Sequence, residues 1–112
     1  MRELCHLQDL VDAKTKGFEL EVGEESVAIL LAFRDGAVYA YRNACPHVGT
    51  PLNWLPDQFL DSEEQYLQCA THGALFRIHD GYCEYGPCAG DSLQAEAVTV
   101  TDHRVYWVDG DA

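Results

Sequence analysis

Positive charge is scarce in this chain of 112 residues. Seven Lys and Arg stand against 19 Asp and Glu, so the net charge is −12 when the five His are neutral. Phosphate groups repel so acidic a chain, which argues against nucleic acid or an anionic membrane surface as a partner. A partner with a basic docking face fits the charge better.

Long apolar runs are missing as well. The longest, Val27–Phe33, has seven residues, far fewer than the roughly 20 needed to span a bilayer. The N-terminus carries Glu3, Asp9 and Asp12 and no apolar signal core. We therefore expect a cytoplasmic protein without a membrane segment. In that compartment five cysteines, an odd number, favour metal ligation over a disulfide framework.

Helical patterns are rare, and the remaining pattern is that of strands. No window shows an apolar stripe of helical period with caps, although residues 9–15 and 57–65 could each hold a helical turn. Phe18–Val22 alternates apolar and acidic residues, which predicts a half-buried strand. The continuous run Val27–Phe33 is typical of a strand buried on both faces.

Turn residues separate the predicted strands. Asp35-Gly36 predicts a hairpin into Val38–Tyr41. In the same way, Asp102-His103 predicts a turn from Val98–Thr101 into Arg104–Val108. Many short strands between such turns indicate one all-β domain with a sandwich or barrel architecture.

Two short clusters carry metal-binding side chains. Cys45-Pro46-His47-Val48-Gly49 and Cys69-Ala70-Thr71-His72-Gly73 each offer one thiolate and one imidazole, followed by a glycine. Together they read C-x-H-x21-C-x-x-H. A zinc site accepts these ligands too, but zinc motifs usually place two Cys close together and two His close together. Here each cluster mixes the two types.

The pattern resembles the Rieske [2Fe–2S] proteins, whose two cluster loops read C-x-H and C-x-x-H. The resemblance covers most of the chain, including His72–Phe76, the Asp80-Gly81 turn, and Gly86-Pro87 in the place of the family's proline loop. It implies the Rieske fold, an all-β antiparallel sandwich with a small cluster-binding subdomain inserted. Residues 1–112 would form a single Rieske domain, with the subdomain at approximately 43–90.

The resemblance also implies the ligands of one [2Fe–2S] cluster per chain. Cys45 and Cys69 would bind the buried iron, and His47 and His72 would bind the outer iron. Two neutral imidazoles in place of two thiolates make the site less negative. The cluster therefore accepts an electron more readily than an all-cysteine cluster does.

Four positions separate this chain from the quinol-oxidising Rieske proteins. Those proteins carry a disulfide between the loops and place Ser and Tyr hydroxyls as donors to the cluster's sulfurs. Here Thr50 and Thr71 replace the disulfide cysteines, and Ala74 and Phe76 replace the hydroxyl residues. Fewer donors stabilise the reduced state less, so we expect a midpoint potential of about −150 mV rather than about +300 mV.

Three further features concern the loops. By the same resemblance, Gly49 and Gly73 let the backbone turn close to the cluster, where amide groups can donate to the sulfurs. The gap between the loops is longer than is common, and we place the extra length between Trp54 and Gln65. The proline loop Gly86–Gly90 lacks a second proline.

The implied function is one-electron transfer by a soluble Rieske-type ferredoxin. A flavin-dependent reductase would reduce it, and an oxygenase or similar terminal enzyme would accept the electron, both docking near His47 and His72. The chain has no nucleotide-binding glycine loop and no Ser/His/Asp arrangement, so we interpret it as a carrier rather than an enzyme. Alternatives are a small Rieske-like subunit of a larger reductase, such as an assimilatory nitrite reductase, and a structural zinc-binding module. A redox sensor would need a further responding domain.

Other chemically distinctive residues have two interpretations each. Cys83 and Cys88 could be extra redox groups or a local disulfide, but we favour small buried residues in a reducing compartment. Trp54, Leu55 and Phe59 could form a docking flap or pack on the sheets, and the sequence favours neither.

The remaining candidates are charged or titratable residues near predicted turns. Acidic residues between the cluster loops could steer a basic partner, but a solvated loop is the commoner meaning of such a run. These residues are Asp57, Asp61, Glu63 and Glu64. We expect His6, His79 and His103 at the surface and Cys5 in a strand.

Overall fold

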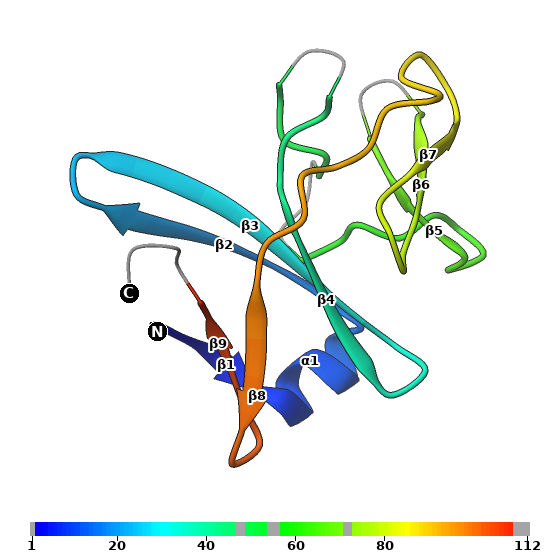
Figure 1. Cartoon of the computed structure of the whole chain (residues 1–112). Coiled ribbons are helices and arrows are strands. Elements are labelled where there is room, and N and C mark those ends of the chain that lie inside the picture. Colours follow the sequence, from blue (N-terminus) through cyan, green and yellow to red (C-terminus); the bar gives the residue numbers. More distant parts are fainter. Residues whose placement is uncertain (1, 47–48, 54–56, 71–72, 109–112) are drawn as a thin grey trace.

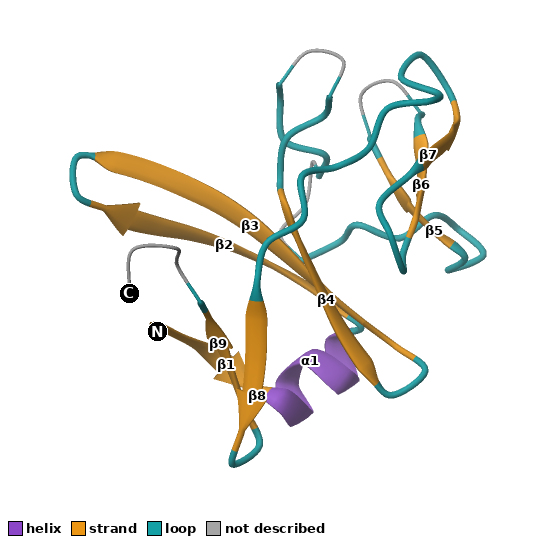
Figure 2. Cartoon of the chain, viewed as in Figure 1, coloured by secondary structure: helices purple, strands orange, loops and turns teal. Residues whose placement is uncertain are grey.

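The computed structural model describes residues 2–46, 49–53, 57–70 and 73–108. Within these ranges, nine strands form three antiparallel sheets with the orders β1-β9-β8, β2-β3-β4 and β5-β6-β7. One short helix lies near the N-terminus (Figures 1 and 2). The elements are β1 (Arg2–His6), α1 (Leu7–Ala13), β2 (Thr15–Val22), β3 (Glu25–Arg34), β4 (Ala37–Arg42), β5 (Tyr66–Gln68), β6 (Leu75–Arg77), β7 (Cys83–Tyr85), β8 (Val98–Thr101) and β9 (Arg104–Trp107).

The β2-β3-β4 sheet is the longest and follows the sequence pattern. β2 pairs with β3 along its whole length, from Thr15↔Ala32 to Val22↔Glu25. The predicted hairpin turn at Asp35 and Gly36 is confirmed, with φ angles of 51° and 82°. Two successive positive φ angles match the right-handed twist of the strands, which is why Asp-Gly suits this turn.

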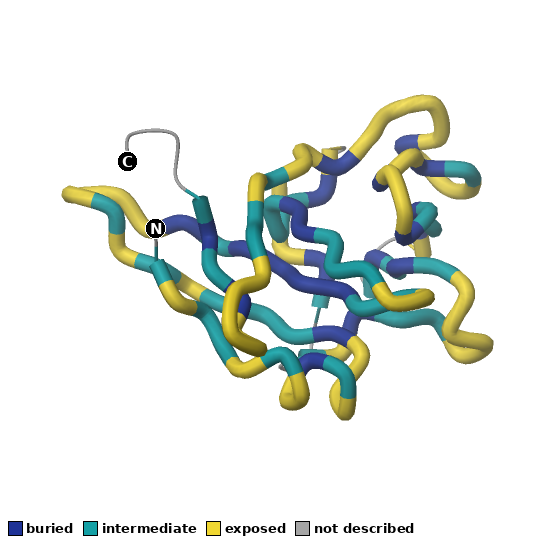
Figure 3. The backbone as a smooth tube through the Cα atoms, turned by 60° about the horizontal axis from the view of Figure 1, so that its bottom comes forward, coloured by how far each residue is buried: buried dark blue, intermediate teal, exposed yellow. Residues whose placement is uncertain are grey.

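Strand β3 is buried on both faces, which explains its continuous apolar run. Ile29 and Leu31 face the β1-β9-β8 sheet and belong to a core with Trp107. Leu30 and Ala32 face the other way, into a core shared with the β5-β6-β7 sheet. In Figure 3 buried residues line the interior where the sheets meet, whereas the turns are exposed.

The β1-β9-β8 sheet and α1 cover one side of the long sheet. β9 is the central strand, and the predicted turn before it has Asp102 and His103 at φ 51° and 64°. Helix α1 begins and ends earlier than the predicted 9–15, because Lys14 adopts φ 72° and Thr15 already belongs to β2. No helix in the described part of the chain is long and apolar enough to cross a membrane.

The β5-β6-β7 sheet is small and packs on the face of the long sheet opposite the β1-β9-β8 sheet (Figure 1). The segment that leads into it, residues 57–65, holds no helix, so the helical turn predicted there is wrong. Asp61 accepts hydrogen bonds from the N–H groups of Gln65 and Tyr66 at 2.8 and 3.0 Å. A side chain that binds backbone groups in this way stabilises a turn in place of a helix.

Candidate functional site

The first cysteine loop begins three residues after β4. Cys45 is buried, and its N–H donates to the carbonyl oxygen of Thr50 at 2.8 Å. The N–H of Gly49 donates back to the carbonyl oxygen of Cys45 at 2.7 Å. Gly49 has φ 78° and open space around it, so the backbone angle rather than crowding requires glycine there.

The second cysteine loop, which follows β5, repeats this arrangement. Cys69 is buried, and its N–H donates to the carbonyl oxygen of Ala74 at 2.9 Å. The N–H of Gly73, at φ 72°, donates to the carbonyl oxygen of Cys69 at 2.8 Å. The same two bonds at the same spacing hold both loops in one backbone frame. The N–H groups of the two glycines are therefore used by cysteine carbonyls and not by sulfurs.

Hydrogen bonds join the two loops to each other. The N–H of Ala70 donates to the carbonyl oxygen of Leu52 at 2.8 Å. The Asn43 side chain also holds this stretch. Its Oδ1 accepts the N–H of Leu52 at 2.8 Å, and its Nδ2 donates to Oδ1 of Asn53 at 2.9 Å. Sequence reasoning missed Asn43, although an Asn two residues before Cys45 was a readable signal for a loop-holding side chain.

A third loop, Gly86–Gly90, packs against the second. Gly86 has φ 105°, and a Cβ atom built there would lie 2.6 Å from the Cα of Ala74. No residue with a side chain fits so close to another backbone. Figure 1 shows the segments after β4, between β5 and β6, and after β7 gathered at the upper end of the molecule.

Two further thiols lie under the third loop. The Sγ atoms of Cys83 and Cys88 are 3.3 Å apart, and both residues are buried, as predicted. Burial, together with the neighbouring thiols of Cys83 and Cys45, raises the pKa of Cys88 to about 12. The Cys88 thiol also lies beside that of Cys45. Their close contact was not predictable from the spacing alone.

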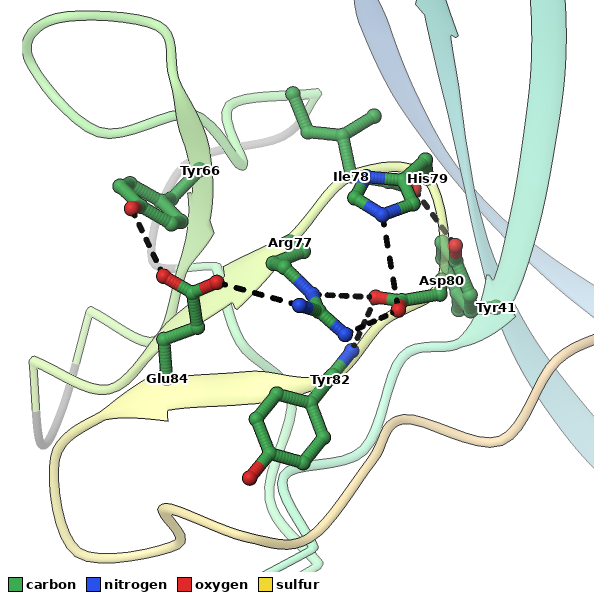
Figure 4. A network of polar contacts seen from close by, with 8 residues as sticks. All are labelled: Tyr41, Tyr66, Arg77, Ile78, His79, Asp80, Tyr82 and Glu84. Carbon is green, nitrogen blue, oxygen red and sulfur yellow. Dashed lines mark hydrogen bonds and ion pairs between the residues drawn. The ribbon is translucent and has the colours of Figure 1, made fainter.

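A polar network supports this end of the molecule (Figure 4). Arg77 forms ion pairs with Asp80, in the β6–β7 turn, and with Glu84 on β7. Asp80 also accepts the N–H of Tyr82 at 3.0 Å. The Arg77 guanidinium, followed by that N–H, lowers the pKa of the Asp80 carboxyl. Glu84 in turn accepts the Tyr66 hydroxyl at 3.0 Å, which links β5 to β7.

The structure places half of the predicted ligand set. Cys45 and Cys69 share one core, which also contains Cys83 and Cys88. His47 and His72 lie outside the described residues, as does Thr71. Among the residues that are described, no group of three or more His, Cys, Asp or Glu could hold a metal ion. The assignment of the four ligands therefore stays a prediction.

The structure answers part of the question of what the segment between the cysteine loops contacts. Phe59 is 1% exposed and packs on β2, where its ring would lie 3.0 Å from a Cβ at Gly17. Trp54 and Leu55 lie outside the described residues. Two of the acidic residues bind nearby lysines: Asp57 pairs with Lys16 and Glu64 with Lys14.

The predicted histidines and Cys5 lie where the sequence indicated. His6, His79 and His103 are exposed. Cys5 is on β1, opposite Val105 of β9.

The donor set fits an iron–sulfur cluster. None of the five cysteines forms a disulfide. Cys45 and Cys69 are buried at equivalent positions of two matched loops, with Pro46, Gly49 and Gly73 exposed around them. Buried thiols inside a shell of loop backbone suit a cluster whose cysteine side is shielded from water.

A family model and solved structures agree with this arrangement. The model of the Rieske [2Fe–2S] domain matches residues 2–102. The Sphingomonas yanoikuyae B1 ferredoxin has a similar fold, with a TM-score of 0.68, 20% identity and 96% of each chain covered. The plasma membrane Rieske protein PetC3 from Synechocystis PCC 6803 has a TM-score of 0.69 and 18% identity, with 97% of this chain and 100% of that chain covered.

One similar fold comes from a complex. It is a structure of reduced oxygenase and oxidised ferredoxin in carbazole 1,9a-dioxygenase, with a TM-score of 0.70 and 21% identity, covering 95% of this chain and 99% of that chain. No curated protein matches the chain. The family match spans nearly the whole chain and includes the paired cysteine loops, so the chain belongs to the Rieske [2Fe–2S] domain family, which implies one [2Fe–2S] cluster per chain.

Proposed function

We propose that this chain is a Rieske-type ferredoxin that passes single electrons from a flavin-dependent reductase to an oxygenase or similar terminal enzyme. The observation that carries the proposal is the pair of matched loops, which place Cys45 and Cys69 in one buried core at one end of the molecule. The likeness in fold to ferredoxins, including one crystallised with its oxygenase, supports the choice of partners.

Cys45, His47, Cys69 and His72 hold the cluster in this proposal, within a subdomain of approximately residues 43–90 of a single domain. The cluster supplies a site that takes up and releases one electron. In this proposal Cys45 and Cys69 supply two buried thiolates, and His47 and His72 supply two imidazoles. The three loops keep this site in place through the bonds between Ala70 and Leu52 and the contact of Gly86 with Ala74.

The loops also suit docking near His47 and His72. Residues 43–56, 69–76 and 85–90 contain no Asp, Glu, Lys or Arg. Pro46, Pro51 and Pro87 are exposed on the described parts of these loops. An uncharged, partly apolar surface loses little hydration free energy when a partner covers it. The acidic residues elsewhere on the chain then act at longer range, on the encounter with a basic partner.

The first experiment is low-temperature EPR of the dithionite-reduced protein, with iron, zinc and sulfide measured on the same sample. We expect the signal of a reduced Rieske centre together with roughly two irons and two sulfides per chain. About one zinc per chain without an EPR signal, persisting after anaerobic reconstitution with iron and sulfide, would contradict the proposal.

Variants test the four ligands. Cys45→Ala, Cys69→Ala and His72→Ala should abolish the Rieske spectrum, and so should His47→Cys. Cys5→Ala and His79→Ala are matched controls, because Cys5 lies on β1 and His79 is exposed. Both controls should keep the spectrum unchanged. A ligand variant that keeps the native spectrum would show that its residue is not a ligand.

The partners are tested by cross-linking the holoprotein in an extract of its native cells. We expect a bound fraction that contains flavin and reduces the cluster with NADH or NADPH. Stoichiometric purification with a single large subunit, in the absence of cross-linker, would instead indicate a small subunit of a larger reductase.

A further inference from the structure

We propose that Cys83 and Cys88 are a redox-active thiol pair that closes to a disulfide beside the first cysteine loop. Neither residue belongs to the proposed ligand set, and the proposed electron transfer uses neither. Their Sγ atoms are 3.3 Å apart. A disulfide requires about 2.05 Å between the sulfurs, so small rotations of the two side chains bring them to bonding distance.

Backbone hydrogen bonds hold the two cysteines next to each other. Cys83 lies on β7, and Cys88 lies in the Gly86–Gly90 loop that folds back over it. The N–H of Gly90 donates to the carbonyl oxygen of Cys83 at 3.1 Å, and the N–H of Cys83 donates to the carbonyl oxygen of Asp91 at 2.8 Å. The N–H of Asp91 donates to the backbone carbonyl oxygen of Cys88 at 2.9 Å. These hydrogen bonds keep the two cysteines side by side, so that closure of the disulfide involves mainly their side chains.

The reduced pair has a defined arrangement of its own. The Cys83 thiol donates a hydrogen bond to the carbonyl oxygen of Tyr85 at 3.2 Å. The Cys83 and Cys88 sulfurs also share a hydrogen bond, in which either sulfur can be the donor. Oxidation replaces both of these weak hydrogen bonds with one covalent bond and releases the Tyr85 carbonyl.

The oxidant in this proposal is a low-molecular-weight disulfide such as glutathione disulfide. When the loop opens, the Cys88 thiol loses its proton to water, and the resulting thiolate attacks the disulfide, forms a mixed disulfide and releases one glutathione. The Cys83 sulfur then attacks the Cys88 sulfur and releases the second glutathione. The two protein thiols lose two electrons and two protons in total, and the two glutathione thiols gain them.

Burial decides how fast the pair reacts. Cys83 is 0% exposed and Cys88 is 2% exposed, so exchange follows local opening of the Gly86–Gly90 loop. Gly86, Pro87, Ala89 and Gly90 around Cys88 are all exposed, so only this loop has to open. We expect equilibration over hours, with Cys88 reacting first because it lies in the loop.

The test equilibrates the iron-loaded protein anaerobically with graded ratios of reduced to oxidised glutathione. Samples are quenched in acid, unfolded and alkylated, and the modified cysteines are mapped by mass spectrometry. We expect the oxidising end of the series to protect two of the five thiols, in a cross-link between Cys83 and Cys88. Excess reduced glutathione should restore both.

One control variant and two test variants accompany this experiment. Cys5→Ala removes a partly exposed thiol and should leave the cross-link unchanged. Cys83→Ser and Cys88→Ser should each abolish it. If a serine variant fails to fold, the cross-link map of the protein without substitutions still shows whether Cys83 and Cys88 form a disulfide.

Three results would overturn the proposal. The first is alkylation of all five thiols throughout the series. The second is a cross-link that joins Cys5 or Cys45 in place of the pair, and the third is a stable glutathione adduct on Cys88. The EPR signal and iron content of the same samples report on the cluster separately, so a failure here is distinguishable from a failure of the proposed function.

Discussion

Two apolar residues, Ala74 and Phe76, lie fully buried beside the cysteine loops. By the resemblance described above, they stand where the quinol-oxidising Rieske proteins place serine and tyrosine hydroxyls. Neither side chain can donate a hydrogen bond to a sulfur. We therefore expect a low midpoint potential, and a midpoint above about +150 mV, in the upper half of the Rieske range, would contradict that expectation.

Restoring a hydroxyl at either position should raise the midpoint potential. In Ala74→Ser or Phe76→Tyr, a donor that stabilises the reduced cluster by about 1 kcal/mol corresponds to a rise of about 40 mV for one electron. An EPR-monitored redox titration measures the change. Phe33→Tyr is the control, since Phe33 packs in the other core and should leave the potential unchanged. A potential that stays constant in both variants would show that missing hydroxyls do not set its value.

At the scale of elements, three loops and one small sheet must be held together. Cross-loop contacts do this, because β5, β6 and β7 have only three residues each. The contact of Gly86 with Ala74 docks the third loop, and the Tyr41 hydroxyl connects β4 to the turn after β6. Each contact predicts a different effect of mutation.

Gly86→Ala should destabilise the protein more than Gly90→Ala does. Both glycines have positive φ angles, 105° and 97°, so both variants have backbone strain of about 1–3 kcal/mol. Only the Gly86 variant also forces a Cβ to within 2.6 Å of the Ala74 backbone. That clash should cost about 1–3 kcal/mol more. Thermal denaturation of both variants at one scan rate gives the comparison, and equal losses would show that the loop moves away freely.

Tyr41→Phe should remove a buried hydrogen bond and a pH dependence. The Tyr41 hydroxyl donates to the carbonyl oxygen of Ile78 at 2.6 Å, and losing it should cost about 1–2 kcal/mol at neutral pH. Burial raises the pKa of Tyr41 above its usual 10.0, so the folded protein keeps the phenol protonated where the unfolded chain ionises. The free energy of unfolding therefore falls as the pH rises above about 10. Urea unfolding from pH 8 to 11 should show a shallower decline in the variant.

At the scale of the whole molecule, negative charge is unevenly distributed. All seven Lys and Arg contact a carboxylate or a backbone carbonyl of the same chain. The surplus of acidic residues lies outside the loops at 43–56, 69–76 and 85–90. The molecule therefore attracts cations at long range while its proposed docking surface carries no charge to be desolvated.

The reduced protein should react with small oxidants in a charge-dependent way. Its reaction with a cationic oxidant such as hexaammineruthenium(III) should slow as salt is added, and its reaction with anionic ferricyanide should accelerate. Each rate should change several-fold as the Debye length falls from about 30 Å to about 10 Å. Stopped-flow kinetics measures both. Rate constants that do not change with ionic strength would show that the electrostatic potential of the acidic residues does not extend to the site of electron transfer.

The local sequence determined most of the architecture. Alternation in Phe18–Val22, the continuous run Val27–Phe33 and the Asp35-Gly36 turn predicted β2, β3 and their hairpin with β4. Such patterns are reliable because the backbone period and the turn angles depend on neighbouring residues. The resemblance of the two Cys/His clusters to Rieske loops likewise indicated the family that the domain model identifies.

Contacts between distant segments were decided only by the tertiary structure. Residues 57–65 form turns because Asp61 binds backbone groups, and Phe59 packs on Gly17, some forty residues earlier in the chain. The approach of Cys83 to Cys88 likewise depends on how the Gly86–Gly90 loop folds over β7 and against Ala74. A pattern of residue types specifies a strand or a turn from its neighbours, but a side chain chooses its partner only after the sheets have brought remote segments together.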